Sequence, residues 1–469
     1  MRNIVKKTTL VSSLVLALSV NSMYAQSFEW ISSTEGNTWQ KSKAKLQTNA
    51  AQTPILDVSG SEEGTVFKAW GTCFNELGWD ALNMLPRKEQ ETILHKLFSP
   101  EGELRFTMGR FSMNANDYAR DWYSCDEVPG DFQLKYFNIN RDKTTLIPFI
   151  KAAQQYNPNM TFWMSPWSPP SWMKINHYYS VRSDRNQNQM SPLSDVALFE
   201  GSKEKNTKVF PQQLAVNDYF IQDPRYLQTY ANYFCKFIDA YKQQGIAISM
   251  VMFQNESWSY TNYPGCAWTA EGIIRFNTEY LAPTLKKQHP EIKLYLGTIN
   301  TNRYDVIDQV LSDPRMPETI QGVGFQWEGG QILPKLRAKY PQYKYVQTES
   351  ECGWGSFDWK AAEHTFGLMN HYLGNGCEEY TFWNAILYDG GFSGWGWKQN
   401  ALIHVDSKAG TATYTPEYYA VQHYSHYITP GSKILAYKTG KEDKTPVLVV
   451  MTPKKKQVAI AGNFNEKAK

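Results

Sequence analysis

Several motifs that mark common classes of function are missing from this chain of 469 residues. The six cysteines are widely spaced and form neither a CxxC pair nor a zinc-finger pattern, so both free thiols and disulfides remain open for them. The phosphate-binding patterns GxGxxG and GxxxxGKS/T are absent, as are the zinc motif HExxH and the serine elbow GxSxG. We therefore expect no metal and no cofactor, and the sequence does not support a serine hydrolase.

The chain also lacks an excess of charge of one sign. It carries 48 Lys and Arg against 45 Asp and Glu, a formal net charge of +3. A nucleic-acid-binding surface needs a strong cationic excess, so we expect no such partner. Aromatic residues are abundant instead, with 16 Trp, 29 Tyr and 23 Phe. This richness predicts large flat contacts, either within the core or with a ligand.

Long apolar runs are confined to the beginning of the chain. A basic start containing Lys6 and Lys7 precedes the apolar run Thr8–Val20, and the small residue Ala25 ends the segment. The run is too short to span a membrane, and the pattern predicts a cleavable signal peptide over residues 1–25. We expect a secreted or periplasmic protein without a membrane span. The segment carries three basic and no acidic residues, so the mature chain would hold 45 of each sign.

Eight short apolar runs alternate with amphipathic stretches along the chain. Apolar strands that alternate with helices indicate a parallel sheet covered on both faces, and eight of them favour a closed (β/α)₈ TIM barrel. A doubly wound open sheet is the alternative, but no phosphate loop supports it. The predicted strands are Thr65–Trp70, Leu104–Met108, Met160–Met164, Ile246–Phe253, Lys293–Leu296, Thr319–Phe325, Tyr343–Gln347 and Glu379–Phe382.

The two ends of the chain do not follow this alternation. Their β-rich runs predict a small side β-sandwich built from both termini, so we divide the mature chain into residues 26–62, a catalytic barrel over 63–427, and residues 428–469. A polar stretch over residues 176–217 separates the third and fourth predicted strands. A loop of this length is usually functional or disordered, and after a barrel strand it would wall the active-site face.

Two carboxylates follow predicted barrel strands, at the end of the barrel where catalytic groups lie. Glu256 follows the fourth strand and Glu349 the seventh, while Trp167 and Trp383 follow the third and eighth. A pair of carboxyl groups cleaves glycosidic bonds, one as general acid and the other as nucleophile or base, and tryptophan faces stack on sugar rings. The positions therefore predict glycoside hydrolysis. A carbohydrate-binding barrel without catalysis is the alternative from another class.

Several segments resemble glycoside hydrolase family 30, which contains glucosylceramidases, β-1,6-glucanases and β-xylanases. The resemblance implies a (β/α)₈ barrel with a side β-sandwich and hydrolysis with retention of configuration. It covers residues 60 to 450 and is most specific in the run SPWSPPSWMK. The segments are Gly109-Arg110 with Asp117, Ser165–Lys174, Asn255-Glu256, Tyr345–Glu349 and His423–Ser432.

The resemblance also implies roles for individual residues. Glu256 resembles the acid/base, Asn255 the residue that holds the sugar 2-hydroxyl, and Glu349 the nucleophile. The residues that resemble sugar-contacting positions are Asp80, Arg110, Asp117, Trp167 and Trp383. Four of these further positions also have a structural explanation. Arg110 could form a buried ion pair, Trp167 and Trp383 could pack in the core, and Asp117 could satisfy a buried turn.

Two features depart from the family pattern. The seventh strand offers Glu351 besides Glu349, and alternation puts both on the same side of the strand. The Thr-Glu pair matches the family and favours Glu349, with Glu351 as the alternative. Family members often place a Tyr after the sixth strand, where this chain has Gln326, Trp327 and Glu328. We expect Trp327 to serve as a platform for a sugar ring. Glu328 either adds a further carboxylate to the site or is a solvated loop residue.

The substrate is predicted from two further segments, residues 124–132 and 393–400, which look most like the β-1,6-glucanase branch. In the second, Trp395 and Trp397 would help to build a platform for a glucose ring. The expected reaction is a double displacement on a β-glucan oligo- or polysaccharide, which requires carboxyl groups about 5–5.5 Å apart. A glucosylceramidase, a β-glucosidase or a β-xylosidase of the same family is the alternative.

Overall fold

The computed structural model describes residues 29–43, 56–57, 63–181, 218–259, 263–436, 438–439 and 446–464. The predicted signal peptide and most of the predicted insertion, from residue 182 onward, lie outside these residues.

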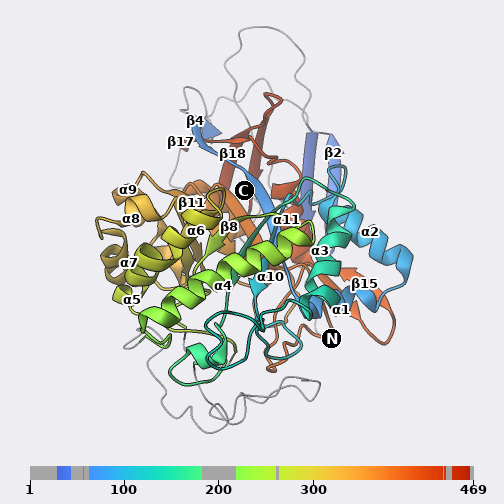
Figure 1. The fold of residues 1–469 in the computed structure, drawn as a ribbon. Helices are drawn as coiled ribbons and strands as arrows, with labels where there is room; N and C mark the ends of the chain where they lie inside the picture. Colours follow the sequence, from blue (N-terminus) through green and yellow to red (C-terminus); the bar gives the residue numbers. More distant parts are fainter. Residues whose placement is uncertain are drawn as a thin grey trace, which may run out of the picture.

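Eight parallel strands form the centre of the molecule and curl into a barrel (Figure 1). Hydrogen-bonded neighbours run in the order β11-β10-β9-β8-β7-β6-β5-β12. The two outer strands meet, since the Glu378 amide donates to the Tyr345 carbonyl at 2.8 Å and the Thr381 amide to Gln347 Oε1 at 2.8 Å. The predicted TIM barrel is confirmed. The strands are β5 (Ala69–Phe74), β6 (Met108–Met113), β7 (Thr161–Pro166), β8 (Ile248–Met252), β9 (Lys293–Ile299), β10 (Gly322–Gln326), β11 (Lys344–Glu349) and β12 (Glu379–Asn384).

The first two predicted strands are placed too early in the sequence. Residues Glu63–Val66 form a strand of a different sheet, and β5 begins only at Ala69. Leu104 and Phe106 are fully buried, but they belong to an irregular segment whose backbone amides bond to carbonyls at the end of helix α2. Burial of that connecting segment produced an apolar pattern that resembled a strand. One consequence is that Arg110 lies within β6 and not after it.

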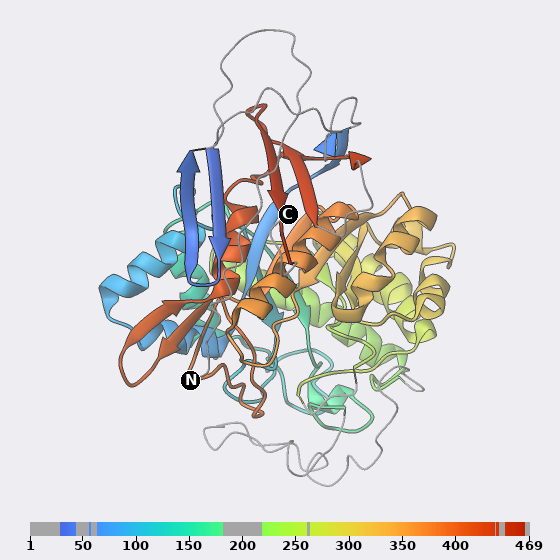
Figure 2. The ribbon, with the colours of Figure 1, turned by 180° about the vertical axis from the view of Figure 1, so that it is seen from behind.

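Helices cover the outside of the barrel (Figures 1 and 2). The longest, α4, starts with Pro224 after Asp223, whose side chain accepts a hydrogen bond from the Arg225 amide. The side chains that α4 buries, such as Tyr230 and Phe234, are fully enclosed. The helices are α1 (Glu76–Asn83), α2 (Arg87–Phe98), α3 (Leu146–Gln154), α4 (Pro224–Gln243), α5 (Ala270–Arg275), α6 (Ala282–Gln288), α7 (Tyr304–Leu311), α8 (Met316–Thr319), α9 (Leu333–Lys339), α10 (Trp359–Gly374) and α11 (Pro416–Ser425).

Strands from both ends of the chain pair beside the barrel, as Figure 2 shows in blue and red. One antiparallel sheet has the order β19-β18-β16-β4, and β3 pairs with β17. The strand β4 therefore belongs to this side sheet by pairing, and the exact domain limits stay a prediction. The remaining strands are β1 (Glu29–Thr34), β2 (Asn37–Lys43), β3 (Leu56–Asp57), β4 (Glu63–Val66), β13 (Ile386–Tyr388), β14 (Ile403–Asp406), β15 (Thr411–Tyr414), β16 (Lys433–Leu435), β17 (Lys438–Thr439), β18 (Val447–Met451) and β19 (Gln457–Ala461).

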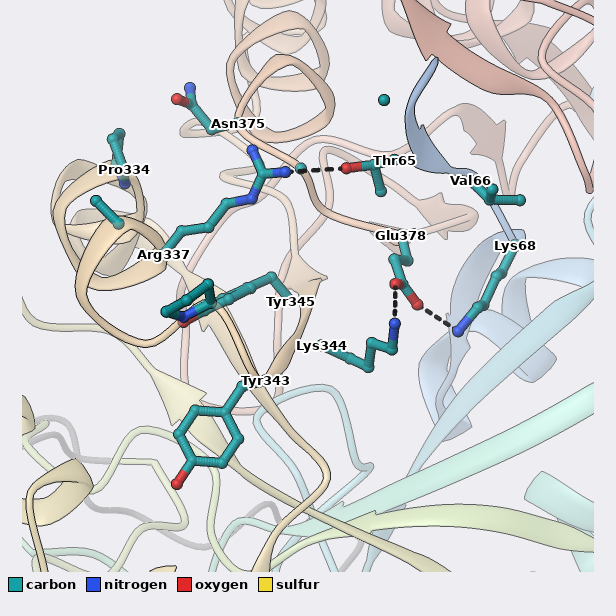
Figure 3. Close-up of a pocket in the computed structure, with 14 residues that line it drawn as sticks. Thr65, Val66, Lys68, Pro334, Arg337, Tyr343, Lys344, Tyr345, Asn375 and Glu378 are labelled. Carbon is teal, nitrogen blue, oxygen red and sulfur yellow. Dashed lines mark hydrogen bonds and ion pairs between the residues drawn. The ribbon is translucent and has the colours of Figure 1, made fainter. Parts of the chain in front are cut away.

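A cleft of about 760 Å³ lies where the barrel meets the side sheet, at the N-terminal ends of β11 and β12 (Figure 3). The charged side chains that line the cleft pair with one another or with a polar neighbour. Glu378 pairs with Lys68 and with Lys344, and Arg337 donates to Thr65 Oγ1 at 3.2 Å. The cleft lies at the end of the barrel opposite to the predicted catalytic carboxylates, because those follow the C-terminal ends of the strands.

Candidate active site

Glu256 and Glu349 come from opposite sides of the barrel mouth. Glu349 is the last residue of β11, while Glu256 lies four residues beyond the end of β8, and two strands separate β8 from β11. Their exposed fractions are 5% for Glu349 and 6% for Glu256. Burial of two carboxyl groups in one place is costly unless partners or a proton compensate their charge.

Arg110 supplies the positive charge between them. Its side chain is fully buried in β6 and donates to Glu349 Oε2 at 2.8 Å and to Asn255 Oδ1 at 2.7 Å. It also donates to the Thr348 carbonyl at 3.0 Å and to Ser165 Oγ at 3.1 Å. The planar fork of the guanidinium thereby fixes the carboxylate and the amide in one rigid arrangement. Arg110 thus forms a buried ion pair with Glu349, one of the two predicted catalytic residues.

Three tryptophan rings enclose the Arg110 guanidinium. The rings of Trp163, Trp167 and Trp383 lie with centroids 4.7, 4.4 and 5.5 Å from its central carbon. Trp167 and Trp383 also stack on each other at 5.4 Å, and both are buried. Their faces stabilise the cation and keep water away from its ion pair.

Glu349 receives a second hydrogen bond from Trp327, whose indole Nε1 donates to Oε1 at 3.1 Å. Trp327 begins the turn after β10 and has a φ of 47°, a left-handed conformation that is uncommon for a bulky residue. The platform expected from Trp327 is thus also a hydrogen-bond donor to the carboxylate. Glu351 behaves differently, since it pairs with His364 of α10 at 2.8 Å and is partly exposed.

Glu256 is surrounded by three side chains for which the sequence predicted no contact with it. Gln326 Nε2 donates to Oε1 at 2.9 Å, while the hydroxyls of Tyr263 and Ser259 donate to Oε2 at 2.7 and 2.9 Å. Gln326 also contacts Asn255 Oδ1 at 3.3 Å. Gln326 ends a barrel strand, so its position was a usable signal, but Tyr263 and Ser259 lie in an irregular loop without any periodic pattern.

The types of donor around the two carboxyl groups decide where a shared proton resides. Both oxygens of Glu349 meet N–H groups of Arg110 and Trp327, which can only donate. Oxygen Oε2 of Glu256 meets the hydroxyls of Tyr263 and Ser259, which can also accept a hydrogen bond. A proton on Glu256 Oε2 could therefore be shared with a neighbouring hydroxyl oxygen, whereas neither Arg110 nor Trp327 could accept a proton from Glu349.

Burial of both carboxyl groups favours a proton on this pair. Burial, together with the negative charge of Glu256, raises the pKa of Glu349 to about 7, although Arg110 opposes the shift. In a coupled pair the step at this pH belongs to the two carboxyl groups together.

Asp117 adds a third carboxyl group near the pair. It is buried with 6% exposure, and its Oδ1 has no hydrogen-bond partner among the described residues. Burial raises the pKa of Asp117 well above its usual value, and the charges of Glu349 and Glu256 raise it further. Its burial beside two other carboxyl groups therefore disfavours the ionised form of Asp117.

The comparisons with known proteins identify the family of this chain. A model of the glycosyl hydrolase family 30 TIM-barrel domain matches residues 67–188 and 219–428. The chain belongs to glycoside hydrolase family 30. A family relative, putative glucosylceramidase 3 of Caenorhabditis elegans, is 26% identical over 419 residues, which cover 84% of this chain and 72% of that protein.

Two further relatives carry another name. Endo-1,6-β-D-glucanase of Neurospora crassa is 22% identical over 409 residues, covering 83% of this chain and 76% of that one. The solved structure of the endo-β-1,6-glucanase BT3312 shares the fold of this family 30 chain with a TM-score of 0.74 and 20% identity, and the match covers 92% of each chain.

Two of the residues expected to contact sugar lie outside the network around the carboxylates. Asp80 belongs to α1 and forms an ion pair with Arg120, with oxygen–nitrogen distances of 2.6 and 2.9 Å. Trp395 is 8% exposed and stacks on Tyr179 at 5.1 Å. The structure thus brings Arg110 and Trp327 onto Glu349 and joins Asn255 to them through Arg110, while Asp80 and Trp395 are engaged with other partners.

No cluster of three or more His, Cys, Asp or Glu side chains suited to a metal ion occurs within the described ranges. The six cysteines are free and buried. In the part of the chain that the structure describes, no helix is long and apolar enough to cross a membrane.

Proposed function

We propose that this glycoside hydrolase retains the configuration of its substrate and cleaves β-1,6-linked glucan. The observation that carries the proposal is the unequal environment of the two carboxyl groups. The ionised form of Glu349 is stabilised by two groups that can only donate, and Glu256 can hold a proton between two hydroxyls. These are the states required of a nucleophile and of a general acid.

In the proposed reaction, Glu349 attacks the anomeric carbon while Glu256 gives its proton to the oxygen of the leaving group. The resulting covalent glycosyl-enzyme leaves Glu256 ionised. Glu256 then takes a proton from water, whose oxygen attacks the anomeric carbon and releases Glu349. Arg110 and Trp327 orient Glu349 for the first attack and stabilise it as it leaves in the second step.

Support for β-1,6-glucan as substrate comes from the segments over residues 124–132 and 393–400 and from the two endo-β-1,6-glucanases among the relatives. The glucosylceramidases among the relatives support a β-glucosidic substrate with a lipid leaving group as the second candidate. Both candidates have a β-linked glucose at the bond that is cleaved.

Initial rates on β-1,6-glucan, an aryl β-glucoside, a glucosylated lipid and xylan separate these candidates. We expect the highest kcat/KM on β-1,6-glucan, and absence of activity on it would overturn the substrate proposal. Proton NMR of the first sugar released tests the mechanism, because retention gives the β-anomer before mutarotation. Release of the α-anomer would show inversion.

The Glu256→Gln and Glu349→Gln variants test the two roles. Glu349→Gln should abolish turnover of every substrate. Glu256→Gln should abolish hydrolysis of glucan but retain the first step on an aryl glucoside whose leaving group needs no proton, and added azide should then accelerate product release. Equal residual activity of both variants on both substrates would contradict the assignment.

We also propose that residues 1–25 direct export and are removed. Sequencing of the mature N-terminus from the secreted or periplasmic fraction should find Gln26 first. Protein that is found only inside the cell with Met1 or Arg2 at its terminus would contradict this proposal.

A further inference from the structure

Three aromatic rings lead from Glu256 to the surface. The Tyr263 hydroxyl contacts Glu256 Oε2, and the Tyr263 ring lies 5.6 Å from that of Trp397. The Trp397 ring in turn stacks on Trp354 at 5.7 Å with an interplanar angle of 23°. We call these three residues the aromatic ladder. Its members follow β8, β12 and β11, so the ladder rises from the mouth of the barrel.

The outermost ring is unusually exposed. Trp354 has an exposed fraction of 73%, the largest among the exposed large apolar side chains of the described residues. One face of the indole packs on Trp397, and the exposed fraction requires much of the remaining ring to contact water. Large exposed aromatic surface is unfavourable in water and commonly marks a binding site.

The loop that carries this exposed ring is packed against its neighbours. Trp354 lies between Gly353 and Gly355, which have φ values of 58° and 75°. A Cβ on Gly355 would lie 2.9 Å from the Gly390 carbonyl oxygen, so the loop packs closely against residues 390–400. The Asn400 amide also donates to the Cys352 carbonyl at 2.6 Å. The loop that carries Trp354 is therefore held against its neighbours, and a platform on such a loop lowers the entropic cost of binding.

We propose that the aromatic ladder binds the sugar residues of a β-linked glucan on the leaving-group side of the cleaved bond, with Trp354 as the outer platform. The inference rests on the proposed function, in which Glu256 protonates the leaving group. Tyr263 contacts Oε2 of Glu256, whereas the contacts that lead toward Glu349 pass through Oε1 and Gln326. The ladder thus continues from the oxygen that carries the proton.

The surroundings of the ladder favour sugar over a lipid chain. Trp354 is flanked by two glycines and Ser356, and Lys398 of the facing loop lies over the ring of exposed Phe392 at 4.7 Å. An alkyl chain needs a continuous apolar surface, whereas a pyranose ring stacks its C–H face on an isolated ring and offers hydroxyls to polar neighbours.

Binding to an inactive protein tests the ladder independently of turnover. In the full-length Glu349→Gln variant, calorimetry should give tighter binding as β-1,6-linked gluco-oligosaccharides grow from two to six units. Adding Trp354→Ala should weaken binding of the longer ones by about three- to tenfold and leave the disaccharide within about twofold, the size of one aromatic contact. Trp354→Phe should restore most of the loss. Phe464→Ala, which removes an exposed aromatic ring from the tail after β19, is the matched control.

A parallel measurement uses the active enzyme. Trp354→Ala should lower kcat/KM on β-1,6-glucan by the same factor and leave that on a nitrophenyl β-glucoside unchanged. Equal binding of all lengths with and without Trp354, or no binding of any oligosaccharide, would overturn the inference. So would a loss confined to a glucosylated lipid in micelles. If the wild-type chain cleaves nothing but Trp354→Ala still weakens binding, the ladder stands and the proposed function fails.

Discussion

Arg110 and Glu349 form an ion pair of 2.8 Å in which the side chains are 0% and 6% exposed. In a buried pair, removal of one partner leaves the other charge without compensation. The pair therefore couples stability to catalysis, since the same guanidinium that allows Glu349 to be buried also favours its ionised form.

We predict that Arg110→Met destabilises the protein by about 3–5 kcal/mol and abolishes glycosidase activity, because Glu349 becomes an unpaired buried charge. Urea unfolding at pH 8 measures the free energy. The double variant Arg110→Met/Glu349→Gln should recover part of the lost stability, since no charge is left unpaired. A double variant less stable than Arg110→Met would contradict the account.

Gln326 should act as a positioning residue for the acid/base. It links Glu256 Oε1 at 2.9 Å to Thr348, whose hydroxyl donates to Gln326 Oε1 at 2.9 Å. Gln326→Leu removes a hydrogen bond that orients the Glu256 carboxyl group and should lower kcat on β-1,6-glucan by about 10- to 100-fold. KM should change little. The exposed Gln309→Leu on α7 is the control, and an equal loss there would refute the role.

The barrel was predictable because its strands are buried on both faces and its chemistry follows the strand ends. The predicted strand Lys293–Leu296, for example, lies within the observed Lys293–Ile299. The predicted strand Leu104–Met108 was placed too early because the connecting loop that packs under a helix there is buried as well, and burial alone does not distinguish a loop from a strand. Hydrophobic pattern reports burial, and it reports strand geometry only where alternation or length adds information.

Some residues of the candidate site were likewise predictable from the sequence, and others were not. Asn255, Glu256 and Glu349 are found in the sequence because they stand at or just beyond strand ends with a recognisable motif. Tyr263 contacts Glu256 from a loop, seven residues further along the chain. Its position depends on how that loop folds over the barrel mouth, which no local spacing encodes.

Glu351 lies two residues after Glu349 but has different partners, so it tests the assignment of the nucleophile. Its carboxylate pairs with His364 at 2.8 Å, and this hydrogen bond raises the pKa of His364. We predict that Glu351→Gln keeps kcat on glucan within about threefold. The carboxylate of Glu351 is engaged with His364 of α10, and a partly exposed ion pair contributes little to stability. NMR titration should show the pKa of His364 falling. If Glu351→Gln abolishes turnover while Glu349→Gln does not, the nucleophile is Glu351.

The alkaline limb of the pH–rate profile should report the proton shared by Glu256 and Glu349. Burial and the charge of Glu256 raise the pKa of Glu349 to about 7, and the pair loses its last proton in this step. Below pH 7 the pair holds the proton that the leaving group needs, so kcat/KM on glucan should fall as pH rises through about 7.

A dinitrophenyl β-glucoside provides the control, since its leaving group departs without a proton. With this substrate the decline above pH 7 should disappear while the rate on glucan still falls. The same alkaline decline on both substrates would show that the step belongs to another group.

Glu417 should make the stability of the protein depend on pH. Its side chain is almost fully buried in α11, and burial raises its pKa to about 7, although hydrogen bonds from Asn400 and Thr365 oppose the shift. The folded state therefore binds a proton that the unfolded chain, with a carboxyl pKa near 4.5, has already lost. The stability contributed by this proton is present below pH 4.5 and is lost as pH rises to 7.

We predict that Glu417→Gln removes this loss, because the amide fills the same space without a charge. Relative to the wild type, the variant should gain about 3 kcal/mol of unfolding free energy on going from pH 4.5 to pH 8. Urea unfolding at both pH values measures the gain, and Glu89→Gln on the surface helix α2 is the matched control. A variant whose stability tracks the wild type at both pH values would show that Glu417 is ionised in the folded protein throughout this range.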